Sequence, residues 1–216
     1  MKRTAKATML AAAAAALVLA AAATAAVVRG TGGDDALRGT RGADAISAYA
    51  GNDTVAALPG ADLVRAGTGD DRVSGGEGSD LAYGGGGDDH LFGDGGADVL
   101  WGGSGDDGLH GGAGDDALHG GSGNDTEWGG YGDDRIWAGG GTDVEHGGPG
   151  DDVLHALAPD QDHDTLDCGP GSDTAYVLQS ERAYTRLRGC ERVVVVVSPS
   201  AQDTADAADN DDQADA

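Results

Sequence analysis

Aspartate is the residue whose type and spacing point most directly to chemistry in this chain of 216 residues. From Gly30 the sequence divides into fourteen consecutive blocks of nine residues, and position six of every block is Asp. These residues are Asp35, Asp44, Asp53, Asp62, Asp71, Asp80, Asp89, Asp98, Asp107, Asp116, Asp125, Asp134, Asp143 and Asp152. Carboxylates that recur at a fixed interval can ligate a hard cation where the fold brings them together.

The overall composition also favours cations as partners. The formal net charge is −25, which argues against binding to nucleic acid or to an anionic membrane surface. Glycine accounts for 41 residues and aromatic residues for only 4%, so an ordinary globular core is not expected. Because such a composition alone is typical of a disordered chain, the repeat must explain why the protein folds.

Two further positions of the block are nearly constant. Position four is Gly in all fourteen blocks, and position eight is aliphatic in twelve, from Leu37 to Leu154. In a short strand, the residue at position eight would point inward and its two neighbours outward. Three extra residues, 156–158, follow the last block, and the frame then resumes in two degenerate blocks that keep Asp164 and Asp173.

Blocks such as GGAGDDALH resemble the hemolysin-type (RTX) calcium-binding nonapeptide repeat of secreted bacterial proteins, G-G-x-G-x-D-x-U-x. The resemblance is close over residues 30–155 and loose over 159–176. It implies an all-β fold, a parallel β-roll (a β-helix-like solenoid) with six-residue turns and three-residue strands. Two blocks would form one coil, so that Asp107 stacks with Asp89 and Asp125, and calcium would lie between stacked turns.

Elementary chemistry agrees with this expectation. Glycine lets carbonyl groups approach an ion closely, and Ca²⁺ takes six to eight oxygen ligands. Two stacked carboxylates plus turn carbonyls can supply them, whereas one Asp cannot. Burial of one aliphatic side chain, about 1.5–3 kcal/mol, is smaller than the cost of ordering nine residues. We therefore expect the chain to fold on binding calcium.

The sites are not expected to be equal. Position two is Gly in nearly every block from Gly67 to Gly148, but the first four blocks carry Thr31, Thr40, Tyr49 and Leu58 there. Because such side chains disfavour positive φ, the first four turns should bind calcium weakly or stack without it. Position five adds carboxylates that should face solvent, namely Asp70, Asp88, Asp106, Asp115, Asp133 and Asp151.

Position nine carries rings in the second half of the repeat. On one side of the roll these are Tyr83, Trp101, His119, Trp137 and His155, and on the other Phe92, His110, Trp128 and His146. We expect two outward ladders whose stacked rings stabilise neighbouring strands. The alternative is a flat aromatic surface that binds a glycan or a protein partner.

Glu127 and Glu145 interrupt the aliphatic position eight. Two buried carboxylates on adjacent strands could share a proton, could be neutralised by an ion, or could be avoided by a register reversal. Such a reversal would turn Trp128 and His146 inward. The sequence favours the reversal, because the residues at position seven tolerate either face.

The two ends have a different character from the repeat. Residues 1–26 resemble a signal peptide, with a basic start, an Ala-rich apolar run and a cleavage site at Ala23-Thr24-Ala25. The only cysteines, Cys168 and Cys190, are expected to form a disulfide in an exported chain. We assign 27–158 to the roll, 159–197 to degenerate repeats and a disulfide-linked C-terminal cap, and 198–216 to a disordered acidic tail.

No catalytic motif is visible, so we expect no enzymatic activity. The sequence predicts a secreted, extracellular calcium-binding protein whose partners are calcium ions, with no membrane association after signal cleavage and no nucleic acid. One alternative is an extracellular adhesion or glycan-binding module that uses the position-nine ladders. Another is a helper domain for the folding of an enzyme encoded elsewhere.

Overall fold

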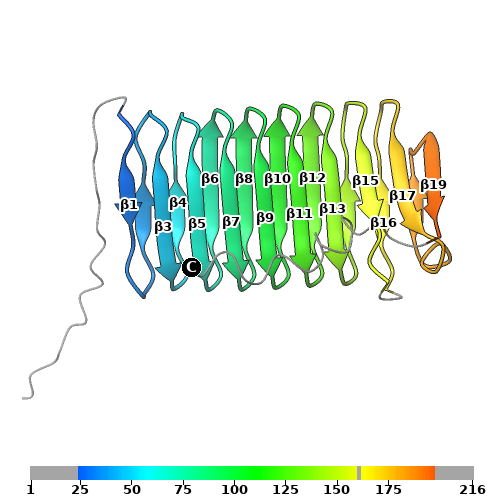
Figure 1. Ribbon diagram of the computed structural model, residues 1–216, viewed down its shortest axis with the longest axis horizontal. Coiled ribbons are helices and arrows are strands. Elements are labelled where there is room, and N and C mark those ends of the chain that lie inside the picture. Colours follow the sequence, from blue (N-terminus) through cyan, green and yellow to red (C-terminus); the bar gives the residue numbers. More distant parts are fainter. Residues whose placement is uncertain (1–23, 160–161, 198–216) are drawn as a thin grey trace, which may run out of the picture.

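Successive strands alternate between two parallel sheets in the computed structural model, which describes residues 24–159 and 162–197. The odd-numbered strands form a ten-stranded sheet and the even-numbered strands a nine-stranded sheet. Each pair of consecutive strands therefore makes one coil of a parallel β-solenoid, which runs from β1 to β19 along the long axis in Figure 1. The all-β roll expected from the sequence is confirmed.

The strand bounds follow the block frame. The ten-stranded sheet contains β1 (Val27–Arg29), β3 (Ala45–Ala50), β5 (Leu63–Thr68), β7 (Leu81–Gly86), β9 (Val99–Ser104), β11 (Ala117–Ser122), β13 (Arg135–Gly140), β15 (Val153–Ala156), β17 (Thr174–Leu178) and β19 (Arg192–Val196). The nine-stranded sheet contains β2 (Ala36–Arg38), β4 (Thr54–Ala56), β6 (Arg72–Glu77), β8 (His90–Gly95), β10 (Gly108–Ala113), β12 (Thr126–Tyr131), β14 (Val144–His146), β16 (Thr165–Asp167) and β18 (Arg186–Arg188).

The register confirms two blocks per coil. Leu100 on β9 is the partner of Leu118 on β11, eighteen residues later, and the other repeat strands keep this spacing. The three residues inserted at 156–158 lengthen one coil, because Leu154 on β15 pairs with Ala175 on β17 at a spacing of twenty-one. The degenerate blocks thus continue both sheets.

The central strands are longer than the three residues expected. Strand β9 covers positions seven to nine of one block and positions one to three of the next, so only positions four to six remain as the turn. The extra residues stay paired, as in the match of Gly103 with Gly121. Both glycines adopt positive φ, 118° and 117°, which lets the chain begin to bend while the ladder continues.

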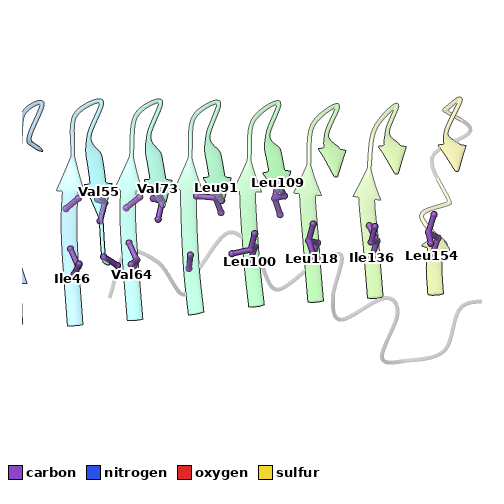
Figure 2. Packing of buried hydrophobic residues seen from close by; sticks show 14 of the residues in the cluster. Ile46, Val55, Val64, Val73, Leu91, Leu100, Leu109, Leu118, Ile136 and Leu154 are labelled. Carbon is purple, nitrogen blue, oxygen red and sulfur yellow. The ribbon is translucent and has the colours of Figure 1, made fainter. Parts of the chain in front are cut away.

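The core lies between the two sheets, and each sheet contributes one row of aliphatic side chains to it. The aliphatic residues at position eight are all buried, and Figure 2 shows them in two rows, one from each sheet. Val55, Val73, Leu91 and Leu109 form one row, and Ile46, Val64, Leu100, Leu118, Ile136 and Leu154 the other. The inward orientation of position eight is confirmed.

The C-terminal region carries the predicted disulfide. Cys168 and Cys190 are bonded, with an S–S distance of 2.02 Å and Cα atoms 5.1 Å apart. The apolar segment expected as a cap forms β17 to β19, and Val193 and Val195 on β19 are partly exposed. Most of the expected signal peptide and the acidic tail lie outside the described residues. Within residues 24–159 and 162–197, no helix is long and apolar enough to cross a bilayer.

Candidate calcium sites

The aspartates at position six form two continuous hydrogen-bonded ladders. The backbone N–H of Asp89 donates to Oδ1 of Asp107 at 2.7 Å, and that of Asp107 donates to Oδ1 of Asp125 at 2.8 Å. On the other side of the roll, Asp80 and Asp98 repeat the same bond at 2.7 Å. All fourteen predicted residues are buried, with 0 to 6% of their surface exposed. The structure therefore brings together the residues eighteen apart that the sequence paired.

The second carboxylate oxygen of these aspartates is buried without a hydrogen-bond partner. This holds for Oδ2 of Asp53, Asp62, Asp71, Asp80, Asp89, Asp98, Asp107, Asp116, Asp125, Asp134 and Asp152. A buried, unsatisfied carboxylate oxygen is costly, so a row of them indicates a missing counter-charge.

Where position one is glycine in the central blocks, oxygen atoms approach that glycine closely. A Cβ atom added to Gly102 would meet Oδ2 of Asp107 at 2.3 Å and the carbonyl oxygen of Gly120 at 2.5 Å. Oxygens of the same kinds surround five further position-one glycines, Gly84, Gly93, Gly111, Gly129 and Gly147. A side chain at position one would collide with these atoms, and carboxylate and carbonyl oxygens are the ligands that Ca²⁺ prefers.

Backbone carbonyls supply the remaining oxygen donors. A Cβ on Gly103 would lie 2.0 Å from the carbonyl oxygen of Gly85, and a Cβ on Gly105 would lie 2.1 Å from that of Gly87. Within the described residues, no three His, Cys, Asp or Glu side chains form a metal-binding group. A cation at these sites would therefore be held by stacked aspartates together with main-chain oxygens.

Burial makes the charged form of these carboxylates unfavourable. It raises the pKa of Asp89 and of Asp107 to about 8, against the opposing effect of the backbone hydrogen bond that each accepts. Neighbouring aspartates raise both pKa values further. Burial also raises the pKa of Asp125 and Asp134 to about 7. At neutral pH, a bound divalent cation would relieve this electrostatic cost.

A family model described as RTX calcium-binding nonapeptide repeat (4 copies) matches residues 29–64, 58–91, 65–100, 92–127 and 119–154. The chain belongs to this family. The matches together cover more than half of the chain, and they coincide with the strands that carry the two Asp ladders. No curated protein matches the chain. RTX repeats are calcium-binding motifs, so the family supports calcium as the ion for these sites.

The first two RTX blocks satisfy their aspartates differently. Oδ2 of Asp35 accepts hydrogen bonds from the backbone N–H of Thr31 at 2.6 Å and from its hydroxyl at 2.9 Å. Thr40 donates from its backbone N–H to Oδ2 of Asp44 and from its hydroxyl to Oδ1. Threonine at position two thus takes the place that a cation would fill.

The third and fourth RTX blocks resemble the central ones in spite of their side chains at position two. Tyr49 and Leu58 adopt positive φ, 81° and 78°, the conformation that the sequence suggested they would avoid. Strain of this kind costs on the order of 1–3 kcal/mol per residue. Oδ2 of Asp53 and of Asp62 is left without a partner, as in the central blocks. The weak calcium binding expected of the first four turns stays a prediction, and the first two differ from the next two in that their Asp Oδ2 atoms accept hydrogen bonds.

The Asp ladders extend beyond the fourteen predicted residues. The backbone N–H of Asp143 donates to Oδ1 of Asp164 at 3.1 Å, and that of Asp152 donates to Oδ1 of Asp173 at 2.8 Å. The backbone N–H of Asp173 in turn donates to Oε2 of Glu191 at 2.9 Å. The resumed frame identifies both aspartates, and the eighteen-residue spacing after Asp173 could have identified Glu191.

The aspartates at position five lie on the surface, as expected. Their side chains are exposed and form a second, outer ladder in which the backbone N–H of Asp106 donates to Oδ1 of Asp88 at 2.9 Å. This bond runs in the opposite direction to those of position six. The outer carboxylates are therefore separate from the buried RTX sites.

The predicted register reversal at Glu127 and Glu145 is wrong. Glu127 is paired with Glu145, and both side chains are fully buried in the core. Trp128 remains on the outer face, where its ring stacks with those of His110 and His146 at centroid distances of 4.2 and 5.8 Å. The stacking energy of the ladder and the continuous register outweigh the cost of the inward glutamates. Burial, together with nearby carboxylates, raises the pKa of both glutamates well above its usual range.

The two ladders at position nine are stacks of parallel rings. Trp101 and His119 have centroids 3.8 Å apart, His119 and Trp137 4.4 Å apart, and the stack continues through His155 to Tyr176. Adjacent rings cover one another's faces, and this favours the stabilising role over an open platform for sugar rings. The glycan-binding alternative stays a prediction.

Proposed function

We propose that this protein is a secreted calcium-binding protein whose RTX region folds when several calcium ions bind between its stacked turns. The observation that carries the proposal is the row of buried Asp Oδ2 atoms that accept no hydrogen bond. In the central coils, each of those whose block begins with glycine faces that glycine and a carbonyl oxygen of the next coil. The proposed role is binding, without catalysis.

The central coils hold the proposed sites. The central aspartates whose blocks begin with glycine would ligate the ions with one carboxylate oxygen, while the other oxygen accepts the ladder hydrogen bond from the preceding coil. These residues are Asp80, Asp89, Asp98, Asp107, Asp116, Asp125, Asp134 and Asp152. When bound, calcium supplies positive charge and joins adjacent coils through shared oxygen ligands. The glycines at positions one, two and four keep the main-chain oxygens accessible.

Coupling between binding and folding follows from the thin core. The aliphatic row contributes one side chain per block, and the buried carboxylates oppose folding as long as they are charged and unneutralised. The sites require strands from different coils, so they do not exist in the unfolded chain. The free energy of calcium binding is then part of the free energy of folding.

Secretion is supported by two features. The start of the sequence has the pattern of an export signal, and the chain contains the disulfide Cys168–Cys190, a bond typical of oxidising compartments. An external medium rich in calcium would drive folding after export, whereas a compartment poor in calcium would leave the chain unfolded and ready for transport.

Calorimetric titration of the mature chain with calcium, followed in parallel by circular dichroism, tests the proposal. We expect binding of several ions and a simultaneous gain of β-structure that EDTA reverses. Magnesium serves as the control, because it demands octahedral geometry with shorter bonds and should bind far more weakly. β-Structure that is complete in EDTA and unchanged by calcium would contradict coupled folding, and an absence of heat would contradict binding.

A further inference from the structure

Glu127 stands out among the buried residues because the RTX pattern does not require it. The other position-eight side chains of the neighbouring coils are aliphatic, apart from Glu145. Its strand partners are Leu109 on β10 and Glu145 on β14, so the carboxylate lies inside the core between them. Both glutamates are 0% exposed.

The carboxylate of Glu127 reaches the calcium site of its own block. A Cβ on Gly120 would lie 2.3 Å from Oε1 of Glu127, 2.5 Å from Oδ2 of Asp125 and 2.4 Å from the carbonyl oxygen of Ala138. Three oxygens therefore converge beside Gly120. At Gly102, one coil earlier, two oxygens converge and the third neighbour is the carboxyl carbon of Asp107.

Both carboxylate oxygens of Glu127 are buried without a hydrogen-bond donor. The charged groups that act on Glu127 are all carboxylates, namely Glu145, Asp143, Asp125 and Asp164. The unpartnered oxygen, its full burial and its convergence with two other oxygens indicate a cation.

We propose that Glu127 is a ligand of the calcium ion bound at Asp125, so that this site holds one carboxylate more than the sites in the other coils. The inference rests on the proposed calcium binding of the RTX ladder. Added negative ligands strengthen calcium binding, so this site fills first as the calcium concentration rises.

Glu145 offers a natural control because its block differs at position one. Ala138 stands where the block of Glu127 has Gly120, so a methyl group replaces the glycine hydrogen at position one. Glu145 instead lies near the backbone of His155 on the opposite sheet, which partly offsets the rise of its pKa. The two glutamates are thus equally buried but differ in their access to a site.

The test is a calcium titration of the mature chain in the presence of a competing chelator, for wild type and for Glu127→Leu, Glu127→Gln and Glu145→Leu. Leucine restores the side chain usual at position eight, so neither Leu variant should hinder folding. We expect Glu127→Leu to weaken the first-binding ion at least tenfold, Glu127→Gln to weaken it less because an amide oxygen remains, and Glu145→Leu to preserve it.

The outcomes separate this inference from the general proposal. A wild-type chain that binds no calcium would overturn both. A Glu127→Leu variant that binds its first ion as tightly as wild type would overturn the role of Glu127 alone. An equal loss in Glu127→Leu and Glu145→Leu would also overturn it, because the effect would then follow buried charge and not ligation.

Discussion

The first two blocks and the central blocks use the aspartate at position six in two chemically different ways. In the first two blocks, Thr31 and Thr40 donate hydrogen bonds to the carboxylates of Asp35 and Asp44. In the central blocks position two is mostly glycine, and the corresponding oxygen has no donor. One residue per block therefore decides whether the turn completes its hydrogen bonding internally or requires a cation.

This difference has a consequence for how the solenoid ends. A terminal coil has a neighbour on one side only, so a site there would lack some of its ligands. Hydrogen bonds from threonine satisfy the carboxylate without a second coil. The N-terminal end can then remain closed while the central coils respond to calcium, a form of end capping suited to a stacked repeat.

Removal of calcium should produce the largest effect and should separate the two regions. In EDTA we expect peptides from β6 to β13 to lose most of their protection from hydrogen exchange, while those from β1 and β2 change least. Hydrogen-exchange mass spectrometry resolves the regions, and restored calcium should reverse the change. Equal loss of protection in β1 and β2 and in β6 to β13 would mean that threonine does not substitute for the ion.

Removal of single carboxylates should give the next largest difference. Asp107→Ala takes an oxygen from a central site and an acceptor from the N–H of Asp89, so we expect the number of bound ions to fall by at least one. The calcium concentration at the folding midpoint should rise about tenfold or more. Asp35→Ala is the matched control and should bind as many ions as wild type in calorimetry. A loss of ions in the control would show that the first turn is also a calcium site.

Acidification should fold the calcium-free chain, in part, by neutralising the central sites. The folded-state pKa values of Asp89 and Asp107 are raised from 3.8 to about 8 by burial, so the folded chain binds these protons more tightly than the unfolded one. Their contribution to stability is complete below pH 4 and is lost as the pH rises towards 8. Circular dichroism in EDTA should therefore show more β-structure at pH 4 than at pH 8.

The presence of calcium should reverse this dependence, because protons compete with the ion for the same carboxylates. Calcium affinity should fall as the pH decreases from 8 to 5. A calcium-free chain whose β-content does not change between pH 4 and pH 8 would count against buried, unneutralised aspartates.

The parts of the structure that follow the nine-residue period could be predicted from the sequence. The period identifies which residues stack, which side chain points inward and which aspartates meet, because each coil contributes the same local geometry. The disulfide could be predicted from the presence of two cysteines in a chain that is expected to be exported. Even the three inserted residues at 156–158 displace the frame without breaking it.

The details that depend on contacts between coils could not be predicted in this way. The predicted orientation of Glu127 is wrong because the alternation of side chains along one strand does not include the ring stack between strands. That stack holds Trp128 on the outer face. The φ angles of Tyr49 and Leu58 were missed because neighbouring coils impose the turn geometry against local preference. The hydrogen bond from Thr31 to Asp35 could not be predicted, because the repeat pattern indicates only the backbone conformation at position two.

The smallest effect is expected from converting an end block into a central one. Thr31→Gly gives the block GGGGDDALR, which restores the RTX pattern and removes the hydroxyl that donates to Asp35. A Cβ on Gly30 would meet Oδ2 of Asp35 at 2.8 Å and the carbonyl oxygen of Ala48 at 2.5 Å, so two of the oxygens of a site are already in place. We expect stability without calcium to fall by about 1 kcal/mol, the usual value of one hydrogen bond.

The same variant should gain affinity for calcium at this end, by up to one extra ion in calorimetry. Thr68→Gly makes the same chemical change at an exposed position three and should leave the ion count unchanged. If Thr31→Gly loses stability but gains no ion, threonine closes the end of the roll without replacing a cation. The difference between end and centre would then be due to the missing coil and not to the residue at position two.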